Sequence, residues 1–252
     1  MEEKTYKEMV QEITIVNELF RLEKKDIFEI LYETKPIFFK GHFELLSGRH
    51  ADIFFRFALI AQYPWLMEKI SKEMIGWVTN SKPEIGQIDV VLGTSRAGML
   101  FAYDIARELN GKLKTRAVYA KSEPESGYPL PILLEGFNIK RKERVLIVND
   151  ITTTGTGIKI LIDLAKSYGG EVVGICLFGD RALDEPKVKQ IKEEYNFHSI
   201  VTFKMESWEP GKEKCALCDK GIPYVRSRDI NSLTLSKPID EILEPLKTLR
   251  VA

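Results

Sequence analysis

One stretch of the chain combines an acidic side chain with a run of threonines and glycines. Residues 145–158 read VLIVNDITTTGTGI, in which Asn149 and Asp150 follow an apolar run. A Thr/Gly loop before a helix exposes hydroxyls and backbone N–H groups that suit a phosphate, and an acid just before it can accept hydrogen bonds from sugar hydroxyls. The stretch therefore indicates a sugar-phosphate site, with an ordinary strand-to-helix turn as the alternative. The loop residues are Thr152, Thr153, Thr154, Gly155, Thr156 and Gly157.

Residues 89–98, DVVLGTSRAG, repeat this arrangement of an apolar run, a short polar connection and the start of a helix. Exposed backbone amides with a guanidinium nearby could hold a pyrophosphate. The alternative is a simple strand–helix connection. The residues concerned are Thr94, Ser95, Arg96, Ala97 and Gly98.

Apolar runs and helical patterns alternate from residue 87 onward. Strands are predicted over 87–92, 115–120, 144–148, 171–178 and 199–203, and helices over 99–109, 157–168 and 186–195. This alternation predicts an α/β fold with a mostly parallel sheet of about five strands and helices on both faces. Ligands of such sheets bind outside the carboxyl ends of the strands, where both polar stretches lie.

The termini show a different pattern. Residues 6–34 and 64–79 have helical spacing, and an aromatic run over 53–57 is strand-like. We predict an N-terminal helical segment over 1–60 that forms a small hood, a core over 61–205, and a C-terminal extension over 206–252 that could pack on the hood.

The stretch at 145–158 resembles the binding motif for 5-phosphoribosyl-1-pyrophosphate (PRPP) of type I phosphoribosyltransferases. The resemblance implies the fold of that family, a homodimer, and transfer of ribose phosphate to a nitrogenous base. It implies that Asp150 contacts the ribose hydroxyls, that Thr152–Gly157 cradle the 5′-phosphate, that 94–98 form the pyrophosphate loop, and that Mg²⁺ binds largely through the ligand. Asn149 departs from the motif, because the family usually has an acid there.

Residues 41–55, GHFELLSGRHADIFF, resemble the N-terminal signature of orotate phosphoribosyltransferases, the branch that serves pyrimidine synthesis. That resemblance implies that the segment lies over the base and that Phe54 and Phe55 line its pocket. It also implies that Arg181 of the pair Asp180-Arg181 faces the carboxylate of orotate. The alternatives are a surface turn with a core strand, and a solvated arginine. The matching residues are Phe43, Leu45, Ser47, Gly48, Arg49, Phe54 and Phe55.

The loop YAKSEPESGYPLP departs from that branch, whose mobile loop usually carries Lys residues and a His. Lys121 is present and, with Asp150, is our candidate for catalysis, but Glu123 and Glu125 would repel a pyrophosphate. Two hypotheses remain open: an enzyme acting on orotate or on another base such as a purine, and a PRPP- or nucleotide-binding regulator on the same fold.

The composition limits the partners. The 252 residues include 37 Lys plus Arg and 37 Asp plus Glu, so no global basic field would attract nucleic acid or anionic lipid. No apolar run approaches the roughly 18–20 residues needed to span a bilayer. The charged N-terminus MEEKTYKEMVQE does not resemble a signal peptide. We expect a cytoplasmic protein with no nucleic-acid or membrane partner.

Cys215 and Cys218 form a C-x-x-C pair in the polar C-terminal segment. The spacing suits half of a zinc site, but a full site would need His residues or a symmetry mate. We therefore do not expect zinc there and interpret the pair as surface thiols, with zinc binding and redox chemistry as alternatives. Cys176 lies in an apolar run and is expected in the core.

Overall fold

A six-stranded sheet organises the larger of the two units into which the chain divides. The computed structural model describes residues 4–45, 47–81, 85–110, 114–121, 133–134, 136–182 and 185–226. Within these limits, the larger unit comprises residues 4–34 and 57–204, and the smaller unit comprises 35–56 and 205–226.

Five parallel strands make up most of the sheet, in the order β7–β6–β8–β9–β10. The order reverses between β6 and β8, because the chain runs outward from β6 to β7 and then returns to the other side of β6. The predicted mostly parallel sheet is confirmed. The bounds are β6 (Val90–Thr94), β7 (Arg116–Ala120), β8 (Arg144–Thr152), β9 (Glu171–Asp180) and β10 (Phe197–Phe203).

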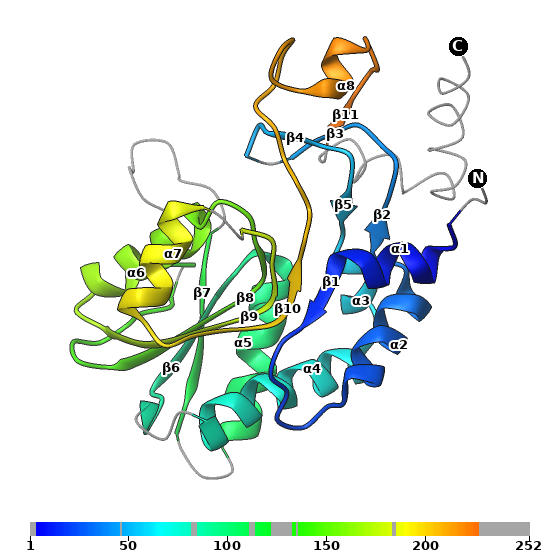
Figure 1. Cartoon of the computed structure of the whole chain (residues 1–252). Helices are drawn as coiled ribbons and strands as arrows, with labels where there is room; N and C mark the ends of the chain where they lie inside the picture. Colours follow the sequence, from blue (N-terminus) through cyan, green and yellow to red (C-terminus); the bar gives the residue numbers. More distant parts are fainter. Residues whose placement is uncertain are drawn as a thin grey trace. The chain divides into compact units, whose positions relative to one another are not determined.

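Helices cover both faces of this sheet (Figure 1). Helices α4 (Pro64–Gly76) and α5 (Ser95–Leu109) lie on one face, and α6 (Thr156–Ser167) and α7 (Pro186–Glu194) lie on the other. Because side chains of a strand alternate between faces, strands covered twice are apolar at nearly every position. The core beneath α6 and α7 includes Val90, Leu92, Val118, Val145, Ile147, Ile175, Leu177, Ile158, Leu161, Ile162 and Ile191.

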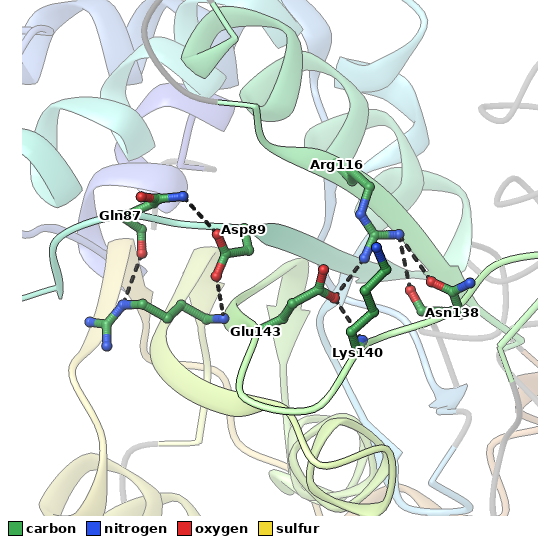
Figure 2. Close-up of polar contacts among 7 residues, drawn as sticks. Gln87, Asp89, Arg116, Asn138, Lys140 and Glu143 are labelled. Carbon is green, nitrogen blue, oxygen red and sulfur yellow. Dashed lines mark hydrogen bonds and ion pairs between the residues drawn. The ribbon is translucent and has the colours of Figure 1, made fainter.

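Polar contacts tie the amino ends of β6, β7 and β8 together, at the end of the sheet opposite the two polar stretches (Figure 2). The Asp89 carboxylate accepts a hydrogen bond from the backbone N–H of Arg144 at 2.9 Å. The Glu143 carboxylate accepts from Arg116 Nη2 at 2.6 Å and from the backbone N–H of Lys140 at 2.7 Å. These contacts help to hold the three strands in register.

The N-terminal segment is not helical throughout 6–34, although its spacing predicts a helix there. It consists of α1 (Tyr6–Ile13), β1 (Thr14–Val16) and α2 (Lys24–Thr34), and β1 pairs antiparallel with β10 at the edge of the sheet. The residues of β1 read TIV, and β-branched side chains fit a sheet better than a helix. The exposed edge of β10 supplies the partner. In the same unit, α3 (Ala58–Ala61) precedes α4, and a π-helical turn (Trp77–Ser81) follows it.

Short strands form the smaller unit. Strand β3 (Phe43–Glu44) pairs with β4 (His50–Ala51) in a hairpin and with β11 (Val225–Arg226) in parallel. Strand β2 (Ile37–Phe38) pairs with β5 (Phe54–Phe55), and α8 (Ala216–Asp219) is a single turn. Residues 4–34, predicted as part of the hood, group instead with the sheet. None of the helices in the described part of the chain is long and apolar enough to cross a membrane.

Candidate functional site

The two polar stretches end neighbouring strands at the point where the strand order reverses. Strand β6 ends at Thr94 and leads into α5, whereas β8 ends at Thr152 and leads toward α6. The two helices lie on opposite faces of the sheet (Figure 1). In open parallel sheets, the position outside the strand ends at such a reversal is where ligands bind.

A hydrogen bond joins the two stretches directly. Ser95 Oγ donates to Asn149 Oδ1 at 3.0 Å and accepts from the backbone N–H of Gly98 at 3.3 Å. Ser95 has a φ of 61°, in the left-handed region that residues other than glycine seldom adopt. Backbone strain of this kind is concentrated at functional sites, where the surrounding structure holds it in place.

Two glycines allow this close approach. A Cβ on Gly93 would lie 2.0 Å from the carbonyl oxygen of Gly98, and a Cβ on Gly98 would lie 2.8 Å from Asn149 Oδ1. The connection predicted over 94–98 is shorter than expected, because α5 begins at Ser95. Arg96 is exposed in the first turn of α5, where backbone N–H groups lack partners within the helix.

Asp150 is a half-buried carboxylate near the end of β8. Burial raises the pKa of Asp150, and hydrogen bonds from the backbone N–H groups of Ile151 and Asp150 itself oppose that rise. Asp150 forms no ion pair with any residue that the structure describes. A partly buried carboxylate without an ion pair lowers the stability of the fold. Such groups are therefore candidates for binding sites.

The turn between β8 and α6 carries hydroxyls and a lysine. Gly155 has a φ of 74° and caps α6, and a Cβ there would lie 2.6 Å from Val188 Cγ2. Thr154 Oγ1 donates to Thr156 Oγ1 at 3.1 Å, and Lys187 Nζ donates to the same oxygen at 3.1 Å. An ammonium group and a helix N-terminus together suit a phosphate.

Strand β8 is longer than predicted. It extends through Asn149 and Asp150 to Thr152, which is buried and stands opposite Asp180 of β9. Thr153 is half-buried, and Gly157 is exposed in the first turn of α6. The polar residues of the motif are therefore placed largely by a strand and a helix.

Arg181 lies beside this strand end. Its backbone N–H donates to the carbonyl of Thr152 at 3.1 Å, and its side chain is buried. Asp180 is also buried and accepts from the backbone N–H of Ala182 at 2.8 Å and from Lys192 Nζ at 2.5 Å. The alternative of a solvated Arg181 is wrong, and its contact with a bound base stays a prediction.

Residues 65–210 match the family model of the phosphoribosyl transferase domain. This match spans more than half of the chain and includes both strand ends of the candidate site. The chain belongs to the phosphoribosyltransferase family.

Two relatives and one solved structure illustrate the similarity. The orotate phosphoribosyltransferase of Caldanaerobacter subterraneus subsp. tengcongensis is 37% identical over 205 residues, which cover 81% of this chain and 97% of that protein. The orotate phosphoribosyltransferase of Caldicellulosiruptor saccharolyticus is 32% identical over 202 residues, which cover 80% of this chain and 95% of that protein. The structure of orotate phosphoribosyltransferase from Aeropyrum pernix shares the fold, with a TM-score of 0.55 and 21% identity over 70% of this chain and 93% of that one.

The segment expected to cover the base in this phosphoribosyltransferase forms the β3–β4 hairpin. Gly48 turns the hairpin with a φ of 79°, and its N–H donates to the carbonyl of Leu45 at 2.9 Å. Arg49 donates to Ser207 Oγ at 2.9 Å and to Glu209 at 2.9 Å. Arg49 thus fastens the hairpin to the C-terminal segment of the same unit.

The aromatic pair expected in the base pocket lies in β5. Phe54 is half-buried, with its ring 6.2 Å from the ring of Phe38 and 5.6 Å from that of Phe43. Phe55 is buried within the smaller unit. Of the two, Phe54 is the more exposed residue, and a role for either stays a prediction.

Lys121 directly follows β7 and is half-buried. Most of the loop YAKSEPESGYPLP, with Glu123 and Glu125, falls outside the described residues. The described Leu134 donates its N–H to the carbonyl of Tyr119 at 2.8 Å, so the chain returns to β7. The role of Lys121 in catalysis stays a prediction.

Some features of the site were missed by sequence reasoning. In the sequence, Lys187 and Lys192 look like ordinary solvated lysines of an amphipathic helix. The one local signal is Pro186, which indicates where the first turn of this helix lies. The Ser95–Asn149 hydrogen bond joins residues 54 positions apart, so no local pattern could reveal it.

The expectation of surface thiols at the C-x-x-C pair is wrong. Cys215 is buried and Cys218 is half-buried, because the β3–β4 hairpin packs against them. Cys176 lies in the core as predicted, and burial raises the pKa of its thiol well above the ordinary value.

Proposed function

We propose that this protein is an orotate phosphoribosyltransferase, a pentosyltransferase that transfers ribose 5-phosphate from PRPP to orotate and releases pyrophosphate. The observation that carries the proposal is the Ser95–Asn149 hydrogen bond, which joins two predicted anion sites at neighbouring strand ends. PRPP has a phosphate and a pyrophosphate on one ribose, so a protein that binds it needs two anion sites beside a sugar site. The 37% identity to a named orotate phosphoribosyltransferase supports this choice of substrate.

In the proposed reaction, a ring nitrogen of the base gives up its proton to solvent and attacks the anomeric carbon of the ribose. The new bond from nitrogen to carbon forms as the bond from carbon to pyrophosphate breaks, and the pyrophosphate leaves with the electron pair. The protein contributes mainly by positioning both reactants and by stabilising the developing charges. Asp150 orients the ribose, and the N-termini of α5 and α6 hold the pyrophosphate and the 5′-phosphate.

Mg²⁺ is the proposed cofactor, and the donor set fits it. Mg²⁺ prefers oxygen ligands and usually binds through one or two carboxylates plus substrate phosphates. The half-buried carboxylate of Asp150, with no ion pair in the described part of the chain, offers such an oxygen. When bound, the metal would neutralise charge on the leaving pyrophosphate. With Asn149 in place of a second acid, this site depends on its ligand for the remaining oxygens.

Recognition of the base is assigned to Arg181, Phe54 and Phe55. A guanidinium can bind a carboxylate through two parallel hydrogen bonds, and orotate carries one carboxylate that most other bases lack. Arg181 follows the strand that is paired with β8, close in register to Thr152.

A PRPP- or nucleotide-binding regulator on the same fold is the alternative. Two features favour it. Asn149 removes a carboxylate that could bind the metal, and Glu123 and Glu125 place negative charge in a loop where catalysis would use positive charge. Transfer to another base, such as a purine, is a further alternative within the enzyme class.

The deciding experiment measures pyrophosphate release from Mg–PRPP by the purified full-length chain with orotate, uracil, adenine, guanine or hypoxanthine. We expect release only with orotate. Turnover with a purine would show that the substrate is a purine and not orotate. PRPP binding without turnover on any base would favour the regulator over the enzyme. Failure to bind PRPP or any nucleotide 5′-phosphate would overturn both the enzyme and the regulator hypotheses.

Asp150→Asn should lower this activity by about 100-fold or more, because charge-assisted contacts to the reacting sugar are lost. The control is Asp163→Asn on α6, whose exposed carboxylate pairs with Lys159 and which should keep wild-type activity. Since burial raises the pKa of Asp150, its charged form at neutral pH destabilises the fold relative to an amide. Asp150→Asn should therefore be no less stable than wild type, which separates loss of activity from unfolding.

A homodimer and a cytoplasmic location belong to the same proposal. Light scattering on the full-length chain tests the first, and a monomer at micromolar concentration would contradict it. Fractionation of the cells that express the protein tests the second.

A further inference from the structure

Four metal-binding side chains meet in the smaller unit. The ligand atoms of His42, His50, Cys215 and Cys218 all lie within 4.8 Å of one another. The whole chain contains only three cysteines and three histidines, so two of each gather at one point. His198, the histidine nearest to the pair in sequence, is not part of the group. All four residues lie outside 65–210, the residues that match the family model.

The distances between these atoms fit one small metal ion. A tetrahedral zinc ion with ordinary bond lengths holds two nitrogens about 3.3 Å apart and a nitrogen and a sulfur about 3.6 Å apart. Cys215 Sγ lies 3.6 Å from His42 Nε2, and Cys218 Sγ lies 3.8 Å from His42 Nε2 and 3.3 Å from His50 Nδ1. The two nitrogens lie 2.8 Å apart and need to separate by only about half an ångström.

The hydrogen bonding of His42 points its free nitrogen at the centre of the group. His42 Nδ1 lies 2.7 Å from the carbonyl oxygen of Ile222, which can only accept, so Nδ1 carries the proton. Nε2 then has a single lone pair, yet one nitrogen and two sulfurs converge on it. That lone pair can accept only one hydrogen bond, so hydrogen bonding does not account for all three contacts. A cation at the centre would bind the two nitrogens and the two sulfurs together. A carbonyl that accepts from the second ring nitrogen is the usual support of a metal-bound histidine.

Local backbone structure presents all four residues. His42 directly precedes β3 and His50 is the first residue of β4, and the backbone N–H of His50 donates to the carbonyl of Trp208 at 2.7 Å. Cys215 caps α8 and Cys218 lies within that turn, as the C-x-x-C spacing requires. The ring of Tyr224 covers the histidines, with centroids 4.7 Å from His50 and 5.7 Å from His42.

We propose that these four residues bind one zinc ion with a structural role. Two thiolates and two imidazoles in a tetrahedral arrangement select zinc over magnesium or calcium, which prefer oxygen. Four protein ligands leave no open position for a substrate, so the site is closed. The ion links the hairpin to a segment more than 160 residues later in the chain, and such a cross-link stabilises the folded form of the smaller unit.

The test uses the full-length chain, expressed in zinc-supplemented medium and purified without a metal column or chelator. Elemental analysis should find about one zinc per chain. Modification of the thiols with a mercurial should release that zinc to a chromogenic chelator. Cobalt(II) exchanged into the wild-type protein should give the intense visible bands of a tetrahedral site and a sulfur-to-cobalt charge-transfer band.

The remaining cysteine and histidine provide matched controls. Cys218→Ser and His50→Phe should lose most of the zinc, whereas Cys176→Ala and His198→Phe should keep it. Wild-type protein that contains no zinc and shows no cobalt bands would overturn the proposal. A disulfide between Cys215 and Cys218, iron as the dominant metal, or equal zinc content in all four variants would also overturn it. The wild-type cobalt spectrum decides the matter even if a variant fails to fold.

Discussion

At the scale of single residues, Asn149 departs from the family motif but keeps a function in the site. Its side-chain oxygen accepts the hydrogen bond from Ser95, which links β8 to the strained first turn of α5. An aspartate could accept the same bond and would add a second negative charge directly next to Asp150. The asparagine therefore preserves the junction between the two candidate anion sites while lowering the negative charge between them.

Lys187 gives a prediction at the same scale. Its ammonium reaches Thr156 at the N-terminus of α6, where the proposed 5′-phosphate binds. Replacing it by alanine removes one charge-assisted contact, so the KM for PRPP should rise roughly fivefold to tenfold with a smaller change in kcat. The control is Lys189→Ala, since Lys189 is an exposed lysine on the same helix. Steady-state kinetics with varied PRPP measure both, and an equal effect of the two variants would contradict the assignment.

At the scale of elements, the sheet and its helices follow from sequence patterns, but the N-terminal segment does not. Strands such as β8 and β9 are covered on both faces, so they appear as nearly continuous apolar runs that sequence reasoning finds. Strand β1 has only three residues and forms because β10 offers a free edge. Its partner lies far along the chain, and periodicity alone therefore extends the helix through it.

Glu73 shows how a charged residue can hold two elements together. It lies on α4, fully buried, and accepts hydrogen bonds from the backbone N–H groups of Phe20, Arg21 and Leu22 at 2.7, 2.7 and 2.8 Å. These bonds fasten the connection between β1 and α2 to α4. From sequence alone, a charged residue on a helix is expected to face solvent. The role of Glu73 is therefore visible only in the structure.

Glu73→Ala should lower the free energy of unfolding by about 3 kcal/mol or more, because three N–H groups lose a charged acceptor and a cavity forms. Denaturant unfolding measures the change. Glu68→Ala on the same helix is the control, since its exposed carboxylate pairs with Lys72 at 2.7 Å on the surface and should matter little. A similar small effect of both variants would show that the Glu73 bonds do not hold the connection.

At the scale of the whole molecule, the candidate phosphate sites were predictable and the cluster of two histidines and two cysteines was not. The phosphate sites are contiguous in sequence, because a strand end and the following helix supply most of their groups. The cluster joins His42 to Cys215, 173 positions later, and no spacing rule covers such a pair. The C-x-x-C indicated half of the site, and only folding of the smaller unit supplies the two histidines.

His198 links global stability to pH. It is buried in β10, with its ring stacked on Trp77 at 5.3 Å and edge-on to Phe20 at 5.6 Å, and its Nε2 has no hydrogen-bond partner among the described residues. Burial lowers its pKa from 6.5 to about 4. Between these two values the unfolded chain binds a proton that the folded chain does not. Stability therefore falls as the pH drops from about 6.5 to about 4, by up to about 3 kcal/mol from this group.

His198→Phe should remove this dependence, because phenylalanine can keep the ring stacking and does not titrate. Urea unfolding of wild type and variant is measured between pH 7.5 and pH 4. The difference between the two stability curves isolates His198, because both proteins share the carboxylates and the cluster of His42, His50, Cys215 and Cys218. We expect the variant to gain stability relative to wild type steadily below pH 6.5. Parallel curves would mean that His198 is protonated in the folded protein, and that water reaches the ring between Trp77 and Phe20.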